Sequence, residues 1–431
     1  MLIATVTVSA AARAPAVASV PVPTTIDATG GRDVTAELNL FLAGVKPGTT
    51  VNFPDRARYR VEGVVTLDRR RNVTIEGHGS TLIATTDGSG VAPSAYNLRA
   101  HWPRMREHVA IRESVGITIH DLTVQGPNSK GTYRPDLEAQ AGFVVLRSRA
   151  VTLDSVTARA TYGDGVYIVG ASKDVILKDC TLDHNGRQGV AVVGGENVTI
   201  TGCTISDTGR SAIDLEPGLG FVRTVHIQDN QVRRYTNFLL AAVGAGVGVQ
   251  DVWLVRNHVE GAKGVSVYVG TERSIRPGIH VIDNTGDGTS AGYQGALMRF
   301  TRFDGIEVRG NHQRVAHGVT PVLLHDSCND TVTANDFAGA STVVSRDGDC
   351  ATPMPPRGAR STSVSSTPAP GAPRKVGPSS STVPPVPPTT AARSSSSGTS
   401  PTSLVVAVGI GALAGVGGTL LTQWGRRNRE P

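Results

Sequence analysis

The stretch that decides the fold is TVHIQDNQV, residues 224–232, because its pattern returns at a fixed interval along the chain. DVWLVRNHV (251–259) and GIHVIDNTG (278–286) repeat it. In each segment apolar and polar residues alternate, which is typical of a β-strand with one buried face. So short a strand cannot bury that face alone. Its regular repetition therefore indicates a solenoid, in which each repeat packs on its neighbours.

The same type of strand recurs outward in both directions from this stretch. Its first inward apolar residues are Val73, Ile117, Val151, Val175, Val198, Val225, Val252, Ile279, Ile306 and Val332. Most intervals are 23 to 27 residues, and the two longer ones contain insertions. This period is too short for a βαβ unit. We therefore predict an all-β fold, a right-handed single-stranded parallel β-helix of about 10 coils.

Residues five positions after each inward anchor support this stacking. They are Leu122, Val156, Cys180, Cys203, Asn230, Asn257, Asn284 and Asn311. Stacked Asn amides can bond from coil to coil and satisfy buried polar groups. With this ladder the chain resembles the pectin-lyase-like superfamily of right-handed parallel β-helices, in which asparagine ladders occur. The resemblance covers about residues 24–350. It identifies no specific enzyme family, because the NTD, DD and RIK motifs of polygalacturonases are missing from this sequence.

The segment 31–48 predicts an amphipathic helix before the first coil. Asp33 is the expected N-cap and Gly44 the expected stop. The apolar stripe consists of Val34, Leu38, Phe41 and Leu42. This helix resembles the N-terminal capping helix of the superfamily, which would shield the first coil from water.

Both ends of the chain predict export and membrane anchoring. Residues 404–424 form an uncharged apolar run long enough to span a bilayer, and the basic tail 425–431 places the C-terminus in the cytoplasm. Residues 351–403 are rich in Pro, Ser and Thr and predict a disordered stalk. The β-helix domain, 24–350, would then be extracellular. Residues 1–23 resemble a weak or truncated signal peptide.

Cysteine spacing matches the coil period. Cys328 and Cys350 are one coil apart, which predicts a disulfide that clamps the last coil. Cys180 and Cys203 are also one coil apart, and either a disulfide or a reduced stack of small core residues fits them. Neither cysteine nor histidine spacing predicts a metal site.

The strand before each anchor carries the candidate chemistry. In SAIDLEPG (211–218), Asp214 and Glu216 point outward from the same strand. Asp164 and Gln188 precede the equivalent strands of the two earlier coils, with Arg187 beside Gln188. We expect these side chains to line one groove. His184, Tyr167, Lys263, Tyr268, Arg299 and His325 would extend it, and Trp102 and Tyr133 lie in insertions that border it.

The leading functional prediction is a surface-anchored carbohydrate-active enzyme that acts on a polysaccharide. A hydrolase would draw its acid and base from Asp164, Asp214 and Glu216. A uronate lyase or C5-epimerase would instead remove the C5 proton with Arg187, Lys263, His184 or Tyr167, with Ca²⁺ as a candidate cofactor.

The alternative is a non-catalytic surface protein that binds glycans or acts as an adhesin, because the fold alone proves no activity. An enzyme should gather Asp164, Arg187, Asp214 and Glu216, whereas a structural module would leave them as separate ion pairs. The net charge of +6 is mild and would allow an acidic partner such as a uronate polymer. The sequence has no basic run interleaved with aromatic residues, which nucleic-acid binding would favour. The Gly-rich segment 244–250 lacks the strand-to-helix context that a phosphate-binding loop needs. We therefore expect neither nucleic acid nor nucleotide as a partner.

Overall fold

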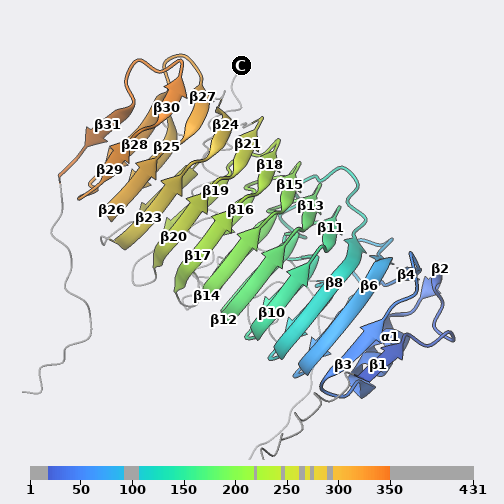
Figure 1. Cartoon of the computed structure of the whole chain (residues 1–431). Helices are drawn as coiled ribbons and strands as arrows, with labels where there is room; N and C mark the ends of the chain where they lie inside the picture. The colour runs from blue at the N-terminus through green and yellow to red at the C-terminus, as the bar shows by residue number, and fades with distance from the viewer. Residues whose placement is uncertain are drawn as a thin grey trace, which may run out of the picture. The chain divides into compact units, whose positions relative to one another are not determined.

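The computed structural model describes residues 18–91, 106–217, 221–243, 248–261, 267–271, 276–288 and 295–349. In these ranges the chain forms one helix and 31 strands. Neighbouring coils pair through parallel strands, for example β12 with β14 and β17 with β20. Figure 1 shows the coils following one another from the helix, in blue, to the last strands, in orange. The predicted parallel β-helix is confirmed.

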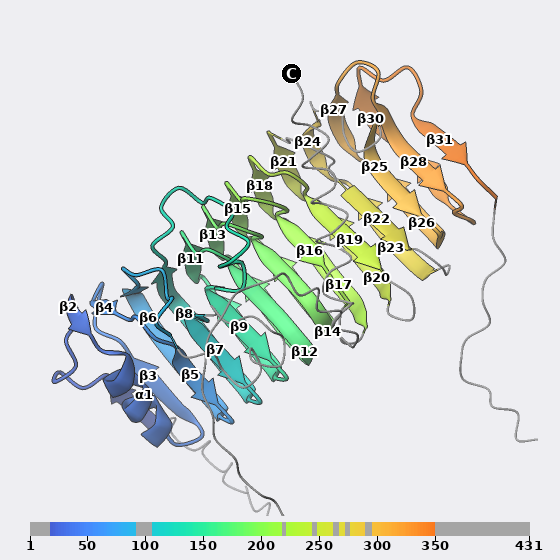
Figure 2. The same ribbon diagram turned by 180° about the vertical axis from the view of Figure 1, so that it is seen from behind.

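Each coil contributes to three parallel sheets, of which the first carries the candidate site (Figure 2). The strands of this first sheet are β5 (Val65–Asp68), β7 (Val109–Arg112), β9 (Phe143–Leu146), the first parts of β12 (Val166–Lys178) and β14 (Val190–Thr201), β16 (Ile213–Leu215), β19 (Leu239–Val243), β22 (Val267–Thr271), β25 (Ala296–Thr301), β28 (Thr320–His325) and β31 (Val344–Asp347).

The second sheet holds the strands that start at the inward anchors. Its members are β1 (Ala18–Pro21), β3 (Thr49–Asn52), the first parts of β6 (Arg71–Ile83) and β8 (Val115–Gln125), β10 (Arg149–Asp154), the second parts of β12 and β14, β17 (Val222–Gln228), β20 (Val249–Val255), β23 (Arg276–Ile282), β26 (Phe303–Arg309) and β29 (Thr331–Thr333).

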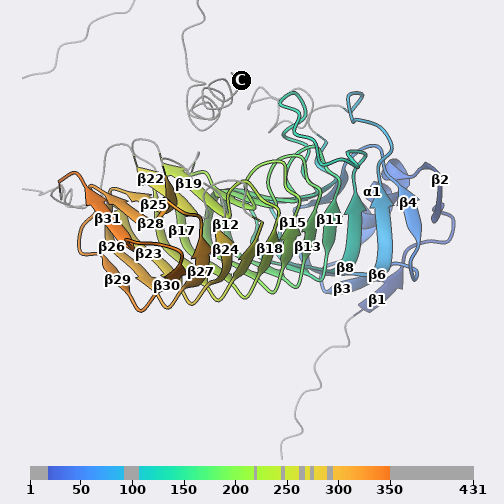
Figure 3. The same cartoon turned by 90° about the horizontal axis from the view of Figure 1, so that it is seen from above.

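The third sheet is made of shorter strands, several of which lie side by side in Figure 3. They are β2 (Thr29–Asp33), β4 (Arg58–Arg60), the second parts of β6 and β8, β11 (Thr157–Arg159), β13 (Thr181–Asp183), β15 (Thr204–Ser206), β18 (Gln231–Arg233), β21 (His258–Glu260), β24 (Thr285–Gly288), β27 (His312–Val315) and β30 (Asp336–Ala338).

The register between coils confirms every predicted anchor except the last. Val332 pairs with Val308, not with Ile306, so that prediction was wrong. Its strand ends a coil of 24 residues, from 308 to 332, which is shorter than the 27-residue coils directly before it. The apolar alternation of the short segment 331–337 fits either register equally well, and the side chain of Asp330, which accepts a hydrogen bond from the Ile306 N–H, favours the observed one.

The predicted Asn ladder occupies the corner between the second and third sheets. Each amide Nδ2 donates to the Oδ1 of the Asn in the next coil, for example Asn230 to Asn257 at 2.9 Å, and to a main-chain carbonyl. The ladder continues one coil further than predicted, from Asn311 to Asn335. A second ladder, of Ser114, Ser148 and Ser172, lies at the corner between the first and second sheets.

The interior of the coils is one continuous apolar cluster. The helix α1 (Thr35–Gly44) adds Leu38 and Leu42 to it. Its N-cap is Val34 instead of the predicted Asp33, although the Asp33 carboxylate does accept the Thr35 N–H at 3.0 Å. That α1 acts as a lid on the first coil stays a prediction.

The two buried cysteines of neighbouring coils are free thiols, so a Cys180–Cys203 disulfide was the wrong alternative. The Cys180 N–H points at the Cys203 sulfur, 3.4 Å away, in the ladder position that Asn occupies further along. Cys328 is buried. Cys350 lies outside the described residues, and the pairing of these two cysteines stays a prediction.

At the N-terminal end, β1 pairs with β3, so residues before the predicted boundary at 24 take part in the β-helix. The segments 1–17 and 351–431 lie outside the described residues, and with them most of the predicted signal-like segment, the stalk and the membrane helix. In the part of the chain that the structure describes, no helix has the length and apolarity needed to cross a membrane.

Candidate active site

Asp214 sits at the centre of the first sheet. It pairs in register with Ala191 in the preceding coil and with Leu240 in the following one. Strand alternation turns Asp214 and Glu216 outward, as predicted. Asp214 is nevertheless only 1% exposed, so it is not a solvated surface acid. Its burial requires partners, and they come from the two preceding coils.

Arg187 joins the predicted acids into one network. One guanidinium nitrogen, Nη1, donates to the Asp164 carboxylate at 3.1 and 3.4 Å. The other, Nη2, donates to both oxygens of Glu216, at 3.1 and 2.9 Å. A single arginine therefore bridges carboxylates that are contributed by two different coils.

Gln188 links the remaining acid to this network. Its side-chain amide donates to Asp214 Oδ2, and its main-chain N–H donates to Asp164 Oδ1 at 3.0 Å. We call Asp164, Arg187, Gln188, Asp214 and Glu216 the Arg187 cluster. The structure thus brings together four of the five predicted catalytic residues and one predicted substrate-binding residue.

The Arg187 cluster is incompletely satisfied. Within the described structure Asp214 Oδ1, Gln188 Oε1 and Arg187 Nε are buried without a hydrogen-bond partner. Most buried polar atoms in proteins have one, so unpaired atoms in a buried charged group call for an explanation. A bound ligand that supplies the missing partners is one such explanation.

Burial also shifts the proton affinities of the two innermost acids. Loss of solvent raises the pKa of Asp164 to about 6, although Arg187 opposes the shift. Loss of solvent and the nearby charge of Glu216 raise the pKa of Asp214 well above its usual range. Burial by itself would lower the pKa of Arg187, but the carboxylates of Glu216 and Asp164 outweigh it and raise that pKa above its ordinary value. Burial therefore favours the protonated form of Asp214, beside an Arg187 that the carboxylates keep charged.

The loop 126–142, between β8 and β9, lies against the Arg187 cluster and adds groups that the sequence did not reveal. Glu138 Oε2 is 3.8 Å from Arg187 Nε. The Tyr133 hydroxyl donates to Glu138 at 2.5 Å and accepts from Arg210 at 3.2 Å. Tyr133 was predicted to bind substrate, and the structure does place it at this site.

Glycines in the turns of successive coils let the loop 126–142 approach so closely. A Cβ at Gly163 would lie 2.3 Å from the Glu138 carbonyl oxygen, and one at Gly186 would lie 2.9 Å from that of Thr132. Gly163, Gly186 and Gly209 are spaced one coil apart in the sequence. This spacing was a signal that a segment crosses these turns, although it does not say which segment.

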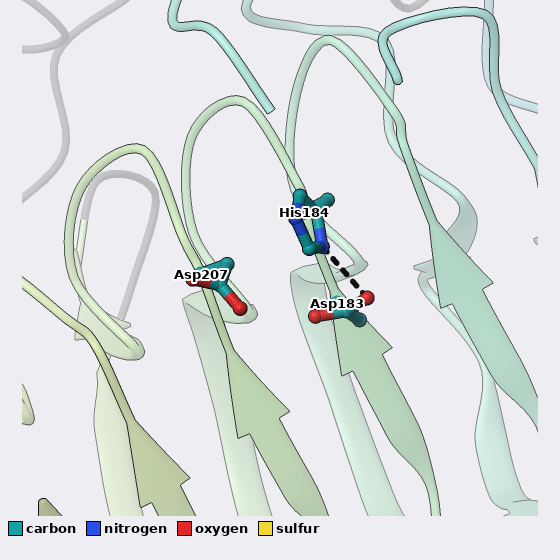
Figure 4. Close-up of side chains that lie close together, drawn as sticks. All are labelled: Asp183, His184 and Asp207. Carbon is teal, nitrogen blue, oxygen red and sulfur yellow. Dashed lines mark hydrogen bonds and ion pairs between the residues drawn. The ribbon is translucent and has the colours of Figure 1, made fainter. Parts of the chain in front are cut away.

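His184 does not join the Arg187 cluster. Figure 4 shows its ring bonded to Asp183, with Nδ1 2.7 Å from a carboxylate oxygen, and Asp207 in the next coil. Potential ligand atoms of these three residues lie within 4.8 Å of one another. However, Arg234 binds both oxygens of Asp207, and Ser206 donates to Asp183. Ca²⁺ takes six to eight oxygen ligands, so this site does not fit it.

The remaining predictions have mixed outcomes. Tyr167 is buried in a small apolar cluster on the outer face of the first sheet and does not line an open groove.

Tyr268 and Arg299 continue the row of Asp214 and Leu240 in the following coils, as predicted. His325 pairs with Asp347 at 2.7 Å. Lys263 and Trp102 lie outside the described residues.

Two carboxyl groups in different surroundings, two residues apart, are the chemical core of the site. Asp214 is buried, and its raised pKa favours the protonated form, which can give a proton. The Glu216 side chain is one-third exposed and meets solvent. Carboxyl groups held in unlike surroundings are the usual mark of an acid and base pair.

Comparisons with known proteins agree with the fold. Residues 107–286 match the family described as right handed beta helix region. No curated protein matches the chain in sequence.

Solved structures with the same fold include three proteins named for activities on polymers. The Yersinia enterocolitica family 28 exopolygalacturonase is 13% identical with a TM-score of 0.56, over 78% of this chain and 76% of that one. A polygalacturonase from Erwinia carotovora is 13% identical with a TM-score of 0.55, over 79% and 99%. The A-module of an Azotobacter vinelandii mannuronan C-5 epimerase is 15% identical with a TM-score of 0.51, over 76% and 98%. At such identities the likeness shows the fold alone, and it agrees with the predicted right-handed parallel β-helix.

Proposed function

We propose that this right-handed parallel β-helix hydrolyses a polysaccharide at the Arg187 cluster. The observation that carries the proposal is the pair formed by a buried Asp214 and a solvent-accessible Glu216 two residues later, both outside the coil. The solved structures with this fold include two polygalacturonases, which supports a role on polymeric sugars.

In the proposed reaction Asp214 is the general acid and Glu216 the general base. Asp214 gives its proton to the glycosidic oxygen as that bond breaks. Water adds to the anomeric carbon, and Glu216 accepts the proton that water loses. Passing this proton from Glu216 back to Asp214 restores the starting state. Asp164 holds the other edge of the Arg187 guanidinium and so fixes the orientation of Glu216.

Hydrolysis is favoured over lyase or epimerase chemistry because three of the four candidate bases for those reactions are unsuited. The fourth, Lys263, lies outside the described residues. The carboxylates around Arg187 hold its pKa above the ordinary value, so it stays protonated. Tyr167 is buried. The ring of His184 is bonded to Asp183.

A reaction panel with the full-length protein tests the proposal. We expect new reducing ends on at least one neutral, amino-sugar or uronate polymer, without the ultraviolet-absorbing unsaturated product of a lyase. Asp214→Asn and Glu216→Gln should each lower kcat by about 10²–10⁴-fold. The matched control is Glu196→Gln, which changes an acid paired with Lys173 and Arg223 on the second sheet. Unaltered turnover in Asp214→Asn would refute the assignment, and binding without turnover would favour the adhesive alternative.

We also propose, from the sequence, that the β-helix is displayed on the outer cell surface. The apolar run 404–424 would hold it in the membrane, with 351–403 as the stalk and 425–431 inside. Protease added to intact cells should release a fragment that contains the β-helix. Full protection of the β-helix, with digestion only after lysis, would contradict this orientation.

A further inference from the structure

We infer that the Arg187 cluster selects a glycan whose reacting sugar carries no carboxylate or sulfate, that is, a neutral or amino-sugar polymer. This inference rests on the proposed function and names its substrate class. It runs against the expectation from the positive net charge of the whole chain, which would allow a uronate polymer.

The first argument is that both terminal nitrogens of the Arg187 guanidinium already donate to carboxylates of the protein. Binding a substrate carboxylate takes free donors, and Arg binds it best with two parallel N–H groups. Here Nη1 faces Asp164 and Nη2 faces Glu216. The remaining nitrogen, Nε, faces Glu138 at 3.8 Å. An incoming carboxylate would therefore have to displace a carboxylate of the protein itself.

The second argument is the sign of charge that solvent meets. The side chains of Glu216 and Glu138 are 33% and 30% exposed, whereas that of Arg187 is 14% exposed. A ligand that approaches Asp214 therefore passes two carboxylates before it reaches the cation between them. Like charges brought together at a partly desolvated site oppose binding, and they exclude the wrong partner more effectively than added contacts select the right one.

The third argument concerns the other guanidinium groups nearby. Arg210 donates to the Tyr133 hydroxyl, and its guanidinium lies 4.6 Å from the centre of the Tyr133 ring. Tyr133 in turn donates to Glu138, so Arg210 supports the negative edge of the site. Arg299 follows Asp214 by three coils in the same row, which is roughly 14 Å at ordinary strand spacing. It lies too far away to neutralise a charge on the sugar at Asp214.

The test uses polymers that share a backbone and differ in charge. The full-length protein is assayed on polygalacturonate and its full methyl ester, on alginate, and on neutral and amino-sugar polymers. We expect turnover on at least one neutral or amino-sugar polymer. On either uronate polymer we expect kcat/KM to be reduced by a factor of roughly 100 or more, because like charges meet at the site.

The variant Glu138→Gln tests the physical cause. It removes one exposed carboxylate and keeps an acceptor for the Tyr133 hydroxyl. We expect binding of oligogalacturonate, measured by calorimetry, to become about tenfold tighter than in the natural protein. Glu196→Gln should leave that binding unchanged. No gain in Glu138→Gln would contradict the inferred repulsion.

The outcomes separate the two proposals. Turnover of polygalacturonate or alginate equal to that of the best neutral polymer would overturn the substrate class and leave the hydrolase proposal standing. Absence of product on every polymer would overturn the hydrolase proposal and the substrate class with it.

Discussion

Two buried polar arrays of this β-helix differ in how completely they are satisfied. In the interior of the Asn ladder, at Asn257, Asn284 and Asn311, each Nδ2 donates at least twice and each Oδ1 accepts twice, for example Asn257 Nδ2 to Ile227 O and to Asn284 Oδ1. In the Arg187 cluster Asp214 Oδ1 and Gln188 Oε1 have no hydrogen-bond partner among the described residues. The ladder is neutral and the cluster is charged.

The difference separates structural from functional polarity. A fully bonded neutral array fixes the stacking of coils and leaves nothing for a ligand to complete. A charged array with unpaired buried atoms is kept at a cost in stability, and such costs are concentrated at functional sites. The predictions below test whether the two arrays respond to substitution as this comparison requires.

The largest effect is expected from removing the central cation. Arg187→Met leaves Asp164 buried without its ion-pair partner, and we expect a loss of about 3–5 kcal/mol in the free energy of unfolding. Chemical denaturation measures it. The control Arg223→Met breaks an exposed pair with Glu196 and should cost less than about 1 kcal/mol. Equal losses in the two variants would mean that the cluster behaves as surface charge.

Breaking the ladder in its middle should cost a similar amount. Asn257→Ala leaves the Asn230 amide and the Ile227 carbonyl without their partners, at about 1–3 kcal/mol for each buried group left unsatisfied. Gln228→Ala, at a half-buried outward position of β17, should change stability by about 0.5 kcal/mol or less. Activity per folded molecule should not change in Asn257→Ala, and a selective loss of kcat there would remove the distinction between the arrays.

The Arg187 cluster, unlike the ladder, should make stability depend on pH. Burial raises the pKa of Asp164 to about 6, above its unfolded value. The native state therefore binds more protons than the unfolded state between these values. The contribution of Asp164 is full below its unfolded pKa and is lost as pH rises through about 6. Asp164→Asn should remove this dependence on pH. Thermal denaturation at pH 4.5 and at pH 7.5 measures it. The melting temperature of the variant, relative to that of the natural protein, should be higher at pH 7.5 than at pH 4.5. The opposite trend would show that Arg187 dominates.

The smallest effect on stability is expected for Asp214→Asn. Burial raises the pKa of Asp214 and so favours its neutral form, and the amide has the same shape. We expect a change of at most about 1 kcal/mol in the free energy of unfolding, together with the loss of activity given above. A large loss of stability would place Asp214 with the ladder, as a structural residue.

Sequence periodicity predicted the fold because the coil repeats a local pattern. The apolar anchors and the Asn positions recur at one spacing, so each coil carries the same evidence. Prediction failed at the ends, where fewer repeats constrain the alignment. Val332 was assigned to the wrong register, and with it Asn335 was missed as the last rung of the ladder.

The candidate site was predicted in part, and for a similar reason. Asp164, Arg187 and Asp214 occupy repeating positions, so coil alignment alone brought them close. Glu138 comes from an insertion outside the repeat, and its approach to Arg187 depends on how that loop folds back over glycine turns. His184 is near Arg187 in the chain, yet its ring is bonded to Asp183.

The sequence by itself determined the coil, its period and the row of acids, because short-range alternation and fixed spacing follow from backbone geometry. Only the tertiary structure decided that Asp214 is buried, that one arginine serves two coils, and that Glu138 and Tyr133 lie beside it. Burial and charge pairing depend on all the atoms around a group, and these come from segments far apart in the chain. The segment SAIDLEPG (211–218) therefore located the two acids in the sequence. The stacking of the coils placed them in different surroundings, with Asp214 buried and Glu216 partly exposed.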